Sequence, residues 1–129
     1  MQRSTNLVII SGPSGAGKDS VINELIKRGL PVERVVTSTT RPERPGEVDG
    51  KSYYFISPEE MKGKIENSEM AEWAHVYGEI YGVFKKELER IQTLKGKIGI
   101  WRIEEQGVRT ARKEYPDILT IAIVAPRED

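Results

Sequence analysis

Apolar residues along the chain follow two patterns: short, nearly continuous runs, and longer polar stretches in which they recur every three or four positions. The runs at 7–10, 98–104 and 118–124 predict strands buried within a sheet. Val21 and Leu25 lie four residues apart, which predicts a helix from about Lys18 to a stop at Gly29-Leu30-Pro31. The other predicted elements are strands at 34–38, 52–56, 70–76 and 80–82 and helices at 57–66, 84–94 and 106–114.

This order of elements predicts the fold class. Strands that alternate with helices indicate an α/β fold with a parallel sheet flanked by helices. The middle of the chain, about 37–83, has short strands and exposed loops, and we interpret it as a small inserted subdomain of mixed α+β type. The core then consists of 1–36 and 84–129, within the size range of one domain.

Composition narrows the function classes without selecting one. The chain has 20 basic and 20 acidic residues, so no overall charge favours nucleic acid or an acidic membrane surface as a partner. It contains no cysteine and no apolar run long enough to span a bilayer. The first six residues lead directly into a predicted strand, which leaves no room for a secretory signal. We therefore expect a cytoplasmic protein.

The turn between the first strand and the first helix has the spacing of a phosphate-binding loop. Gly12, Gly17 and Lys18 match G-x-x-x-x-G-K, in the strand–turn–helix context that the motif needs. Glycines let backbone N–H groups approach phosphate oxygens, and the helix N-terminus favours an anion. The alternative is a purely structural glycine-rich turn. The predicted ATP-binding residues are Gly12, Pro13, Ser14, Gly15, Ala16, Gly17, Lys18, Asp19 and Ser20.

One position of this loop departs from the motif. The residue after the lysine is normally Ser or Thr, whose hydroxyl ligates Mg²⁺, and here it is Asp19. A carboxylate is also an oxygen ligand that Mg²⁺ accepts, directly or through water. Because it adds negative charge beside the nucleotide, we expect the affinity for nucleotide to depend on the metal more than usual.

The middle of the chain carries a second, more specific motif. It reads Ser38-Thr39-Thr40-Arg41-Pro42-x-Arg44-x-Gly46-Glu47-x-x-Gly50-x-x-Tyr53-x-Phe55, and Glu72-Trp73-Ala74, Tyr81-Gly82 and Ile103-Glu104-x-Gln106-Gly107 follow it. Together with the phosphate-binding loop, these residues resemble guanylate kinase over essentially the whole chain. The resemblance implies a fold of the P-loop NTPase type, in which the inserted subdomain binds a nucleoside monophosphate.

The chemistry of this motif suits GMP. Two guanidiniums, on Arg41 and Arg44, and the phenol of Tyr53 supply donors for a dianionic monophosphate. The carboxylate of Glu72 can accept hydrogen bonds from the adjacent N1–H and 2-amino groups of guanine. From the residues alone, a solvated loop and an exposed strand carboxylate remain alternatives. The resemblance implies GMP binding by Thr37, Arg41, Arg44, Tyr53, Glu72 and Tyr81.

Other positions differ from what the resemblance implies. Val83 stands where relatives often have a guanine-contacting serine, and Arg102 where an acid is common. Glu104 replaces an aspartate and is a candidate, with Asp19, to bind Mg²⁺ through water. Arg102 would either add positive charge near the phosphates or form a structural ion pair. We interpret His75 as an ordinary strand residue, and Trp73 and Trp101 as core residues.

The resemblance implies transfer of the γ-phosphoryl group of ATP to GMP, giving ADP and GDP, with Mg²⁺ bound to ATP. Lys18 and Arg41 are the predicted catalytic residues. The alternatives are a non-catalytic interaction module, and a related P-loop kinase that acts on a sugar phosphate. In the family the chain continues beyond the region of Val124 into a lid that carries arginines, and then into a C-terminal segment. We expect the 129 residues without them to bind nucleotides but to transfer phosphoryl poorly.

Overall fold

The computed structural model describes residues 5–13 and 17–124, apart from the side chain of Gln106. The chain forms two compact units. The first, which we call the core unit, consists of Met1–Arg34 and Ile91–Asp129. The second, the inserted unit, is Val35–Arg90. Each unit contains its own four-stranded sheet and is described separately below.

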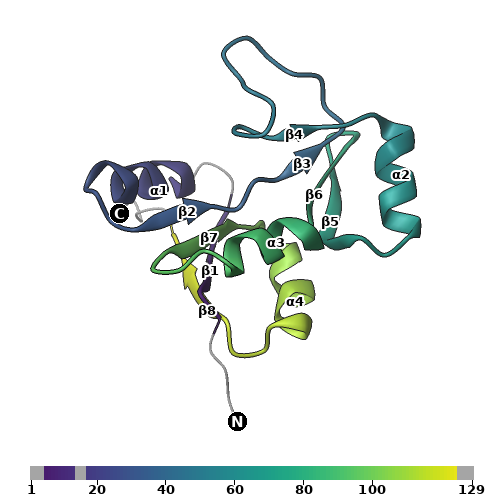
Figure 1. Ribbon diagram of the computed structural model, residues 1–129. Coiled ribbons are helices and arrows are strands. Elements are labelled where there is room, and N and C mark those ends of the chain that lie inside the picture. The colour runs from purple at the N-terminus through teal and green to yellow at the C-terminus, as the bar shows by residue number, and fades with distance from the viewer. Residues whose placement is uncertain (1–4, 14–16, 125–129) are drawn as a thin grey trace, which may run out of the picture. The chain divides into compact units, whose positions relative to one another are not determined.

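The sheet of the core unit is parallel throughout, as the alternation of strands and helices predicted. Its strands lie in the order β2-β7-β1-β8. Two helices of the unit, α1 and α4, flank this sheet (Figure 1). The bounds are β1 Leu7–Ser11, α1 Lys18–Lys27, β2 Val32–Arg34, β7 Ile98–Arg102, α4 Glu105–Glu114 and β8 Leu119–Ala122.

Apolar side chains fill both faces of this sheet because the central strands β1 and β7 are buried on both sides. On one face, Ile10 and Ile100 pack against Ile22 of α1. On the other face, Trp101 is fully buried and contacts the ring of Tyr115, which ends α4. Trp101 is therefore a core residue, as predicted. The strand that leads into the glycine-rich turn is thus packed on both faces.

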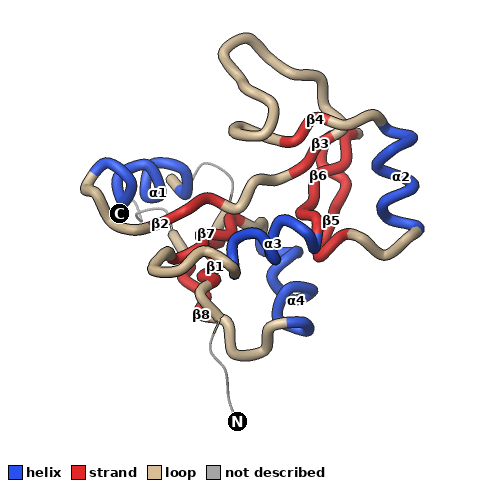
Figure 2. Tube along the Cα trace, viewed as in Figure 1, coloured by secondary structure: helices blue, strands red, loops and turns tan. Residues whose placement is uncertain are grey.

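The inserted unit is mixed α+β, with a sheet in the order β4-β3-β6-β5. Strand β3 pairs with β4 in parallel and with β6 antiparallel, and β5 and β6 form an antiparallel hairpin. A long loop joins β3 to β4 (Figure 2). The bounds are β3 Ser38–Thr39, β4 Tyr54–Phe55, α2 Pro58–Glu66, β5 Met70–Val76 and β6 Glu79–Phe84; α3, Lys85–Gln92, begins in this unit and ends in the core unit.

Local sequence explains how α2 begins. The Ser57 hydroxyl accepts a hydrogen bond from the backbone N–H of Glu60 at 3.1 Å, and Pro58 occupies the first turn. Met61 of this helix is completely buried. The helix therefore forms where the sequence predicted it.

A buried carboxylate ties together three segments of the inserted unit. Glu87, on α3, accepts hydrogen bonds from the Val36 backbone N–H at 2.8 Å and the Tyr54 hydroxyl at 2.9 Å. Arg90, one turn further along α3, forms an ion pair with it. Burial, followed by the hydrogen bond to Glu87, raises the pKa of Tyr54. Sequence patterns gave no indication of these hydrogen bonds, because they join residues more than 30 positions apart.

Two sequence predictions about the strands and one about a helix are wrong. The predicted strand at 34–38 is two separate strands, because β2 ends at Arg34 in one sheet and β3 begins at Ser38 in the other. The strand predicted over 118–124 forms as β8 but is not buried: it is an edge strand, with Leu119 61% and Ile121 43% exposed. The helix predicted from residue 84 begins at Lys85, since Phe84 completes β6.

Trp73 is also not a core residue, contrary to prediction. Its side chain is 42% exposed on β5, which is an edge strand. His75 is a strand residue on the same edge, and its ring contacts that of Trp73 edge-on at 5.6 Å. An alternating pattern identifies the strand but does not show which of its faces is covered.

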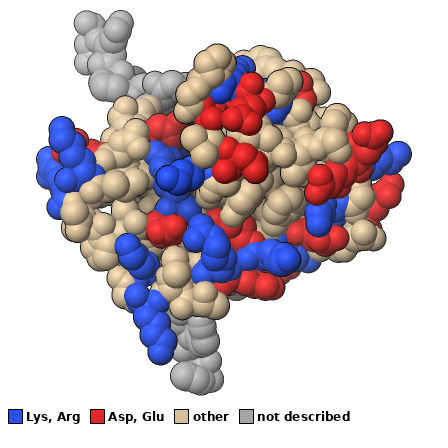
Figure 3. Space-filling view, turned by 45° about the horizontal axis from the view of Figure 1, so that its top comes forward, with Lys and Arg blue, Asp and Glu red and all other residues tan. Residues whose placement is uncertain are grey.

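The surface is mixed in charge, in keeping with the balanced composition. On the face seen in Figure 3, Lys and Arg side chains lie among Asp and Glu side chains. Within the described residues, no helix has the length and apolar character that crossing a membrane requires.

Candidate functional site

The first candidate site begins where β1 ends. Gly12 has a φ of +147°, and a Cβ there would lie 2.2 Å from the backbone oxygen of Ile123, so only glycine fits. Gly17, with a φ of +100°, is the N-cap of α1 and offers no side-chain cap to the first turn. The first N–H groups of a helix have no partner within the helix, and such an end favours an anion.

Lys18 points back over the loop that precedes it. Its side chain is only 5% exposed. The Nζ atom donates to the Gly12 carbonyl at 2.6 Å and to the Pro13 carbonyl at 3.2 Å, and lies 3.6 Å from Glu104 Oε2. A buried ammonium held by carbonyls at the end of a parallel strand is well placed to bind phosphate oxygens instead.

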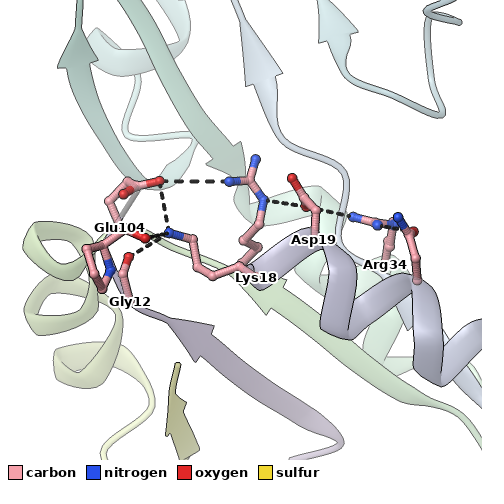
Figure 4. A network of polar contacts seen from close by, with 8 residues as sticks. Gly12, Lys18, Asp19, Arg34 and Glu104 are labelled. Atoms are coloured by element: carbon pink, nitrogen blue, oxygen red, sulfur yellow. Dashed lines mark hydrogen bonds and ion pairs between the residues drawn. The ribbon is translucent and has the colours of Figure 1, made fainter. Parts of the chain in front are cut away.

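Asp19 pairs with two arginine side chains (Figure 4). Its Oδ1 atom lies 3.2 Å from Arg102 Nε and 3.5 Å from Arg34 Nη1. Arg102 also lies 3.8 Å from Glu104 Oε2, the oxygen that pairs with Lys18. Arg102 therefore forms the structural ion pair that was one of the two possibilities raised by the sequence.

Asp19 and Glu104 together fit a magnesium ion only as partial ligands. No group of three or more acidic, histidine or cysteine side chains suited to a metal occurs among the residues the structure describes. Mg²⁺ commonly takes one or two protein carboxylates and completes its shell with phosphate oxygens and water. Asp19 and Glu104 could supply those one or two carboxylates. To bind the ion directly, each would first have to break its ion pairs with Lys or Arg side chains.

The structure describes only some of the other residues predicted to bind ATP. Ser14, Gly15 and Ala16 lie outside the described residues. Pro13 is exposed at the start of the loop, and Ser20 is exposed in the first turn of α1. The structure thus brings together Gly12, Gly17, Lys18, Asp19 and Glu104 at the carboxyl edge of the core sheet.

A second candidate site lies in the inserted unit, around Arg41. This side chain is 8% exposed, which is unusual for arginine. It forms a two-pronged pair with Glu47, at 3.0 Å from Nη1 and 2.8 Å from Nη2, and Nη1 also donates to the Pro42 carbonyl. Of the five N–H donors of a guanidinium, these bonds use three. The remaining two, on Nε and Nη2, lie on the other edge of the guanidinium, and the hydroxyls of Tyr81 and Tyr53 also interact with Arg41.

Aromatic rings surround this guanidinium. Its carbon lies 5.0 Å from the ring centre of Tyr53 and 5.8 Å from that of Phe55. The rings of Tyr53 and Tyr81 meet edge-on at 6.0 Å. The hydrogen bond to Glu47, and to a smaller extent the hydroxyls of Tyr81 and Tyr53, raise the pKa of Arg41 against the opposing effect of burial.

A pocket of about 450 Å³ lies beside this cluster, entirely within the inserted unit. Arg41, Arg44 and Tyr81 are among its lining residues. Arg44 is exposed, and its backbone N–H donates to Glu47 Oε1 at 2.8 Å. The structure therefore brings Tyr53 and Tyr81 against Arg41, and Arg41, Arg44 and Tyr81 line a pocket with donors suited to a phosphate group.

Glu47 is the residue of this site that sequence reasoning missed. The hydrogen bond from Arg41, followed by that from the Arg44 backbone, lowers the pKa of Glu47 from 4.5 to about 2. The signal was available, since an acid three residues after Arg44 in a loop rich in proline and glycine is a candidate partner. Glu47 therefore fixes the orientation of the Arg41 guanidinium.

The Glu47 pair predicts a specific pH dependence. Because its pKa is lowered on folding, the stability that the pair contributes is present above about pH 4.5 and is lost as the pH falls toward 2. Carboxyl NMR should show Glu47 titrating near pH 2. A Glu47 midpoint close to 4.5 would contradict the pair in solution.

The residues predicted to contact guanine lie on neighbouring strands of the same sheet. Glu72, on β5, is 9% exposed and is the register partner of Val83 on β6. Val83 is completely buried. Thr37 is half-buried immediately before β3, and its carbonyl accepts from the Tyr54 N–H. None of these three lines the pocket beside Arg41.

Comparisons with known proteins decide the family. The sequence profile of guanylate kinase matches residues 4–129. The chain belongs to the guanylate kinase family. It is 40% identical to a guanylate kinase of Symbiobacterium thermophilum and 42% identical to one of Thermotoga maritima, over 93% of the chain in each case. It is 31% identical to the crystal structure of a guanylate kinase from Anaplasma phagocytophilum, with a TM-score of 0.74 over 97% of the chain.

The match covers only part of these guanylate kinases. The chain spans 56% of the Symbiobacterium protein, 58% of the Thermotoga protein and 63% of the Anaplasma chain. Family membership confirms the predicted α/β fold of the guanylate kinase type. The roles of individual residues rest on the geometry described above.

Proposed function

We propose that this protein transfers the γ-phosphoryl group of ATP to GMP, giving ADP and GDP. The observation that carries the proposal is the Arg41 cluster, where a buried guanidinium fixed by Glu47 lies beside two tyrosines whose hydroxyls could turn, with it, to a phosphate. In a member of the guanylate kinase family, this arrangement favours a nucleoside monophosphate.

In this proposal each unit binds one nucleotide. The loop at Gly12 and Gly17, the helix end of α1 and Lys18 bind the phosphates of ATP. Arg41, Arg44, Tyr53 and Tyr81 hold the phosphate of GMP, while Glu72 and Thr37 contact the guanine. The inserted unit is then the GMP-binding subdomain, close to the 37–83 expected from the sequence.

The chemistry requires positioning and charge neutralisation rather than a general base, since the acceptor phosphate is already ionised. Lys18 and Arg41 supply fixed positive charge to the two phosphate groups. Mg²⁺ bound to ATP supplies further charge neutralisation, and Asp19 and Glu104 are the carboxylates that would reach it, through water. A kinase specific for a sugar phosphate would have no use for Glu72.

The test is an assay of ATP with GMP, AMP and UMP as acceptors, beside titration of each monophosphate. We expect GMP to be preferred over AMP by roughly tenfold or more, because adenine presents an acceptor where Glu72 needs a donor. Glu72→Ala should lose GMP affinity and most of this preference, whereas Glu66→Ala, an exposed acid at the end of α2, should change neither.

Two other results would contradict parts of the proposal. Equal use of GMP and AMP by the unaltered protein would remove the role of Glu72. GMP binding without any ATP binding would favour the interaction module over the kinase.

A further inference from the structure

We propose that Arg102 is a second phosphate-binding cation of the ATP site, held in place by Asp19. As a result, the protein would bind ATP with less dependence on Mg²⁺ than a phosphate-binding loop with serine or threonine at position 19. This inference rests on the proposed ATP site at Lys18. It goes beyond that site because Arg102 belongs to neither the loop nor the helix that the motif describes.

The position of Arg102 in the sheet brings it to the phosphate-binding edge. It is the last residue of β7 and the register partner of Ile10 on β1, two residues before Gly12. In a parallel sheet, ligands bind beyond the carboxyl ends of the strands. Its side chain is on the same face as Ile100, which packs against α1, and it reaches the first turn of that helix at Asp19.

One oxygen of Glu104 lies close to both Lys18 and Arg102. Glu104 Oε2 lies 3.6 Å from Lys18 Nζ and 3.8 Å from Arg102 Nη1 (Figure 4). Glu104 is 39% exposed, so solvent and ligands have access to this oxygen. A phosphate oxygen near the same place would contact both Lys18 and Arg102, with the guanidinium offering a planar fork of donors.

The negative charge of Asp19 is compensated by neighbouring cations. From the sequence we expected Asp19 to repel the nucleotide and so to strengthen metal dependence. Its carboxylate is paired with Arg102 and Arg34, so it faces cations in the site. Asp19 is 61% exposed, so its hold on Arg102 in water is weak enough for a phosphate to replace it.

The experiment measures ATP affinity by calorimetry, in excess Mg²⁺ and in EDTA. The ratio of the two dissociation constants reports metal dependence directly and needs no turnover. For the unaltered protein we expect the two constants to agree within about tenfold. Arg102→Gln should weaken ATP binding in EDTA by about ten- to a hundredfold, the value of a lost charge-assisted hydrogen bond. Arg102→Lys, which keeps the charge, should lose less.

Two further variants make the test specific. Arg28→Gln is the matched control: Arg28 is 71% exposed at the end of α1 and pairs with Glu24 at 2.9 Å, so the ratio should not change. Asp19→Ser removes the anchor of Arg102 and supplies the usual hydroxyl, so metal dependence should rise. Circular dichroism verifies that each variant is folded.

The outcomes separate this inference from the proposed function. Two results would overturn the role of Arg102 and leave the ATP site intact. One is that the unaltered protein binds ATP only with Mg²⁺. The other is that Arg102→Gln binds ATP in EDTA as tightly as the unaltered protein does. Absence of ATP binding under both conditions overturns the proposed ATP site itself, and this inference with it.

Discussion

Lys18→Ala is expected to lower phosphoryl transfer by roughly 10²–10³-fold or more, the usual effect of removing one preorganised charge-stabilising donor. The ammonium is buried and already lies over the loop, so no other side chain takes its place without rearrangement. ATP binding should weaken as well. The affinity for GMP should stay unchanged, because the proposed GMP residues belong to the inserted unit.

The matched control for this variant is Lys27→Ala. Lys27 is in the last turn of the same helix and is exposed, so the substitution removes the same charge without touching the loop. Turnover and ATP affinity should then stay within about twofold of the unaltered protein, as for most surface substitutions. If Lys18→Ala also kept normal turnover and normal ATP affinity, the phosphate-binding interpretation of the loop would be wrong.

Features encoded by neighbouring residues could be predicted from the sequence. The helix α1 begins at Lys18 because Gly17 ends the loop, and α2 begins at Pro58 because Ser57 caps it. The clustering of Arg41 with Tyr53 also followed from a compact motif, although its geometry did not. Each of these depends on contacts within about a dozen residues, which a linear pattern can express.

Features that depend on distant contacts could not be predicted. The exposure of Leu119 and of Trp73 depends on which strands lie at the edges of the two sheets, and an apolar run is the same in a central strand and an edge strand. The pairing of Asp19 with Arg102 joins residues more than 80 positions apart. The sequence therefore left two interpretations of Arg102, and only the structure showed which carboxylates it contacts.

Arg41→Ala is expected to have the second large effect, a loss of GMP affinity of about a hundredfold or more. The guanidinium of Arg41 would donate charge-assisted hydrogen bonds to the phosphate, and these are the strongest hydrogen bonds in the proposed site. Glu47 would then lack its partner, and the negative charge left in the loop would repel the phosphate. Arg41→Lys should recover little, since an ammonium cannot hold Glu47 with two nitrogens and still present a second edge.

Comparison with two neighbouring variants identifies the cause of this loss. Arg44→Ala removes an exposed guanidinium from the same pocket, and should cost GMP affinity less than Arg41→Ala does. Glu47→Gln keeps Arg41 but weakens its anchor, so we expect an intermediate loss. If the three variants lost affinity equally, the site would act through its total charge, and the fixed geometry of Arg41 would not matter. A larger loss for Arg41→Ala than for Arg44→Ala, with Glu47→Gln between them, would show that GMP depends on a guanidinium that Glu47 has already oriented.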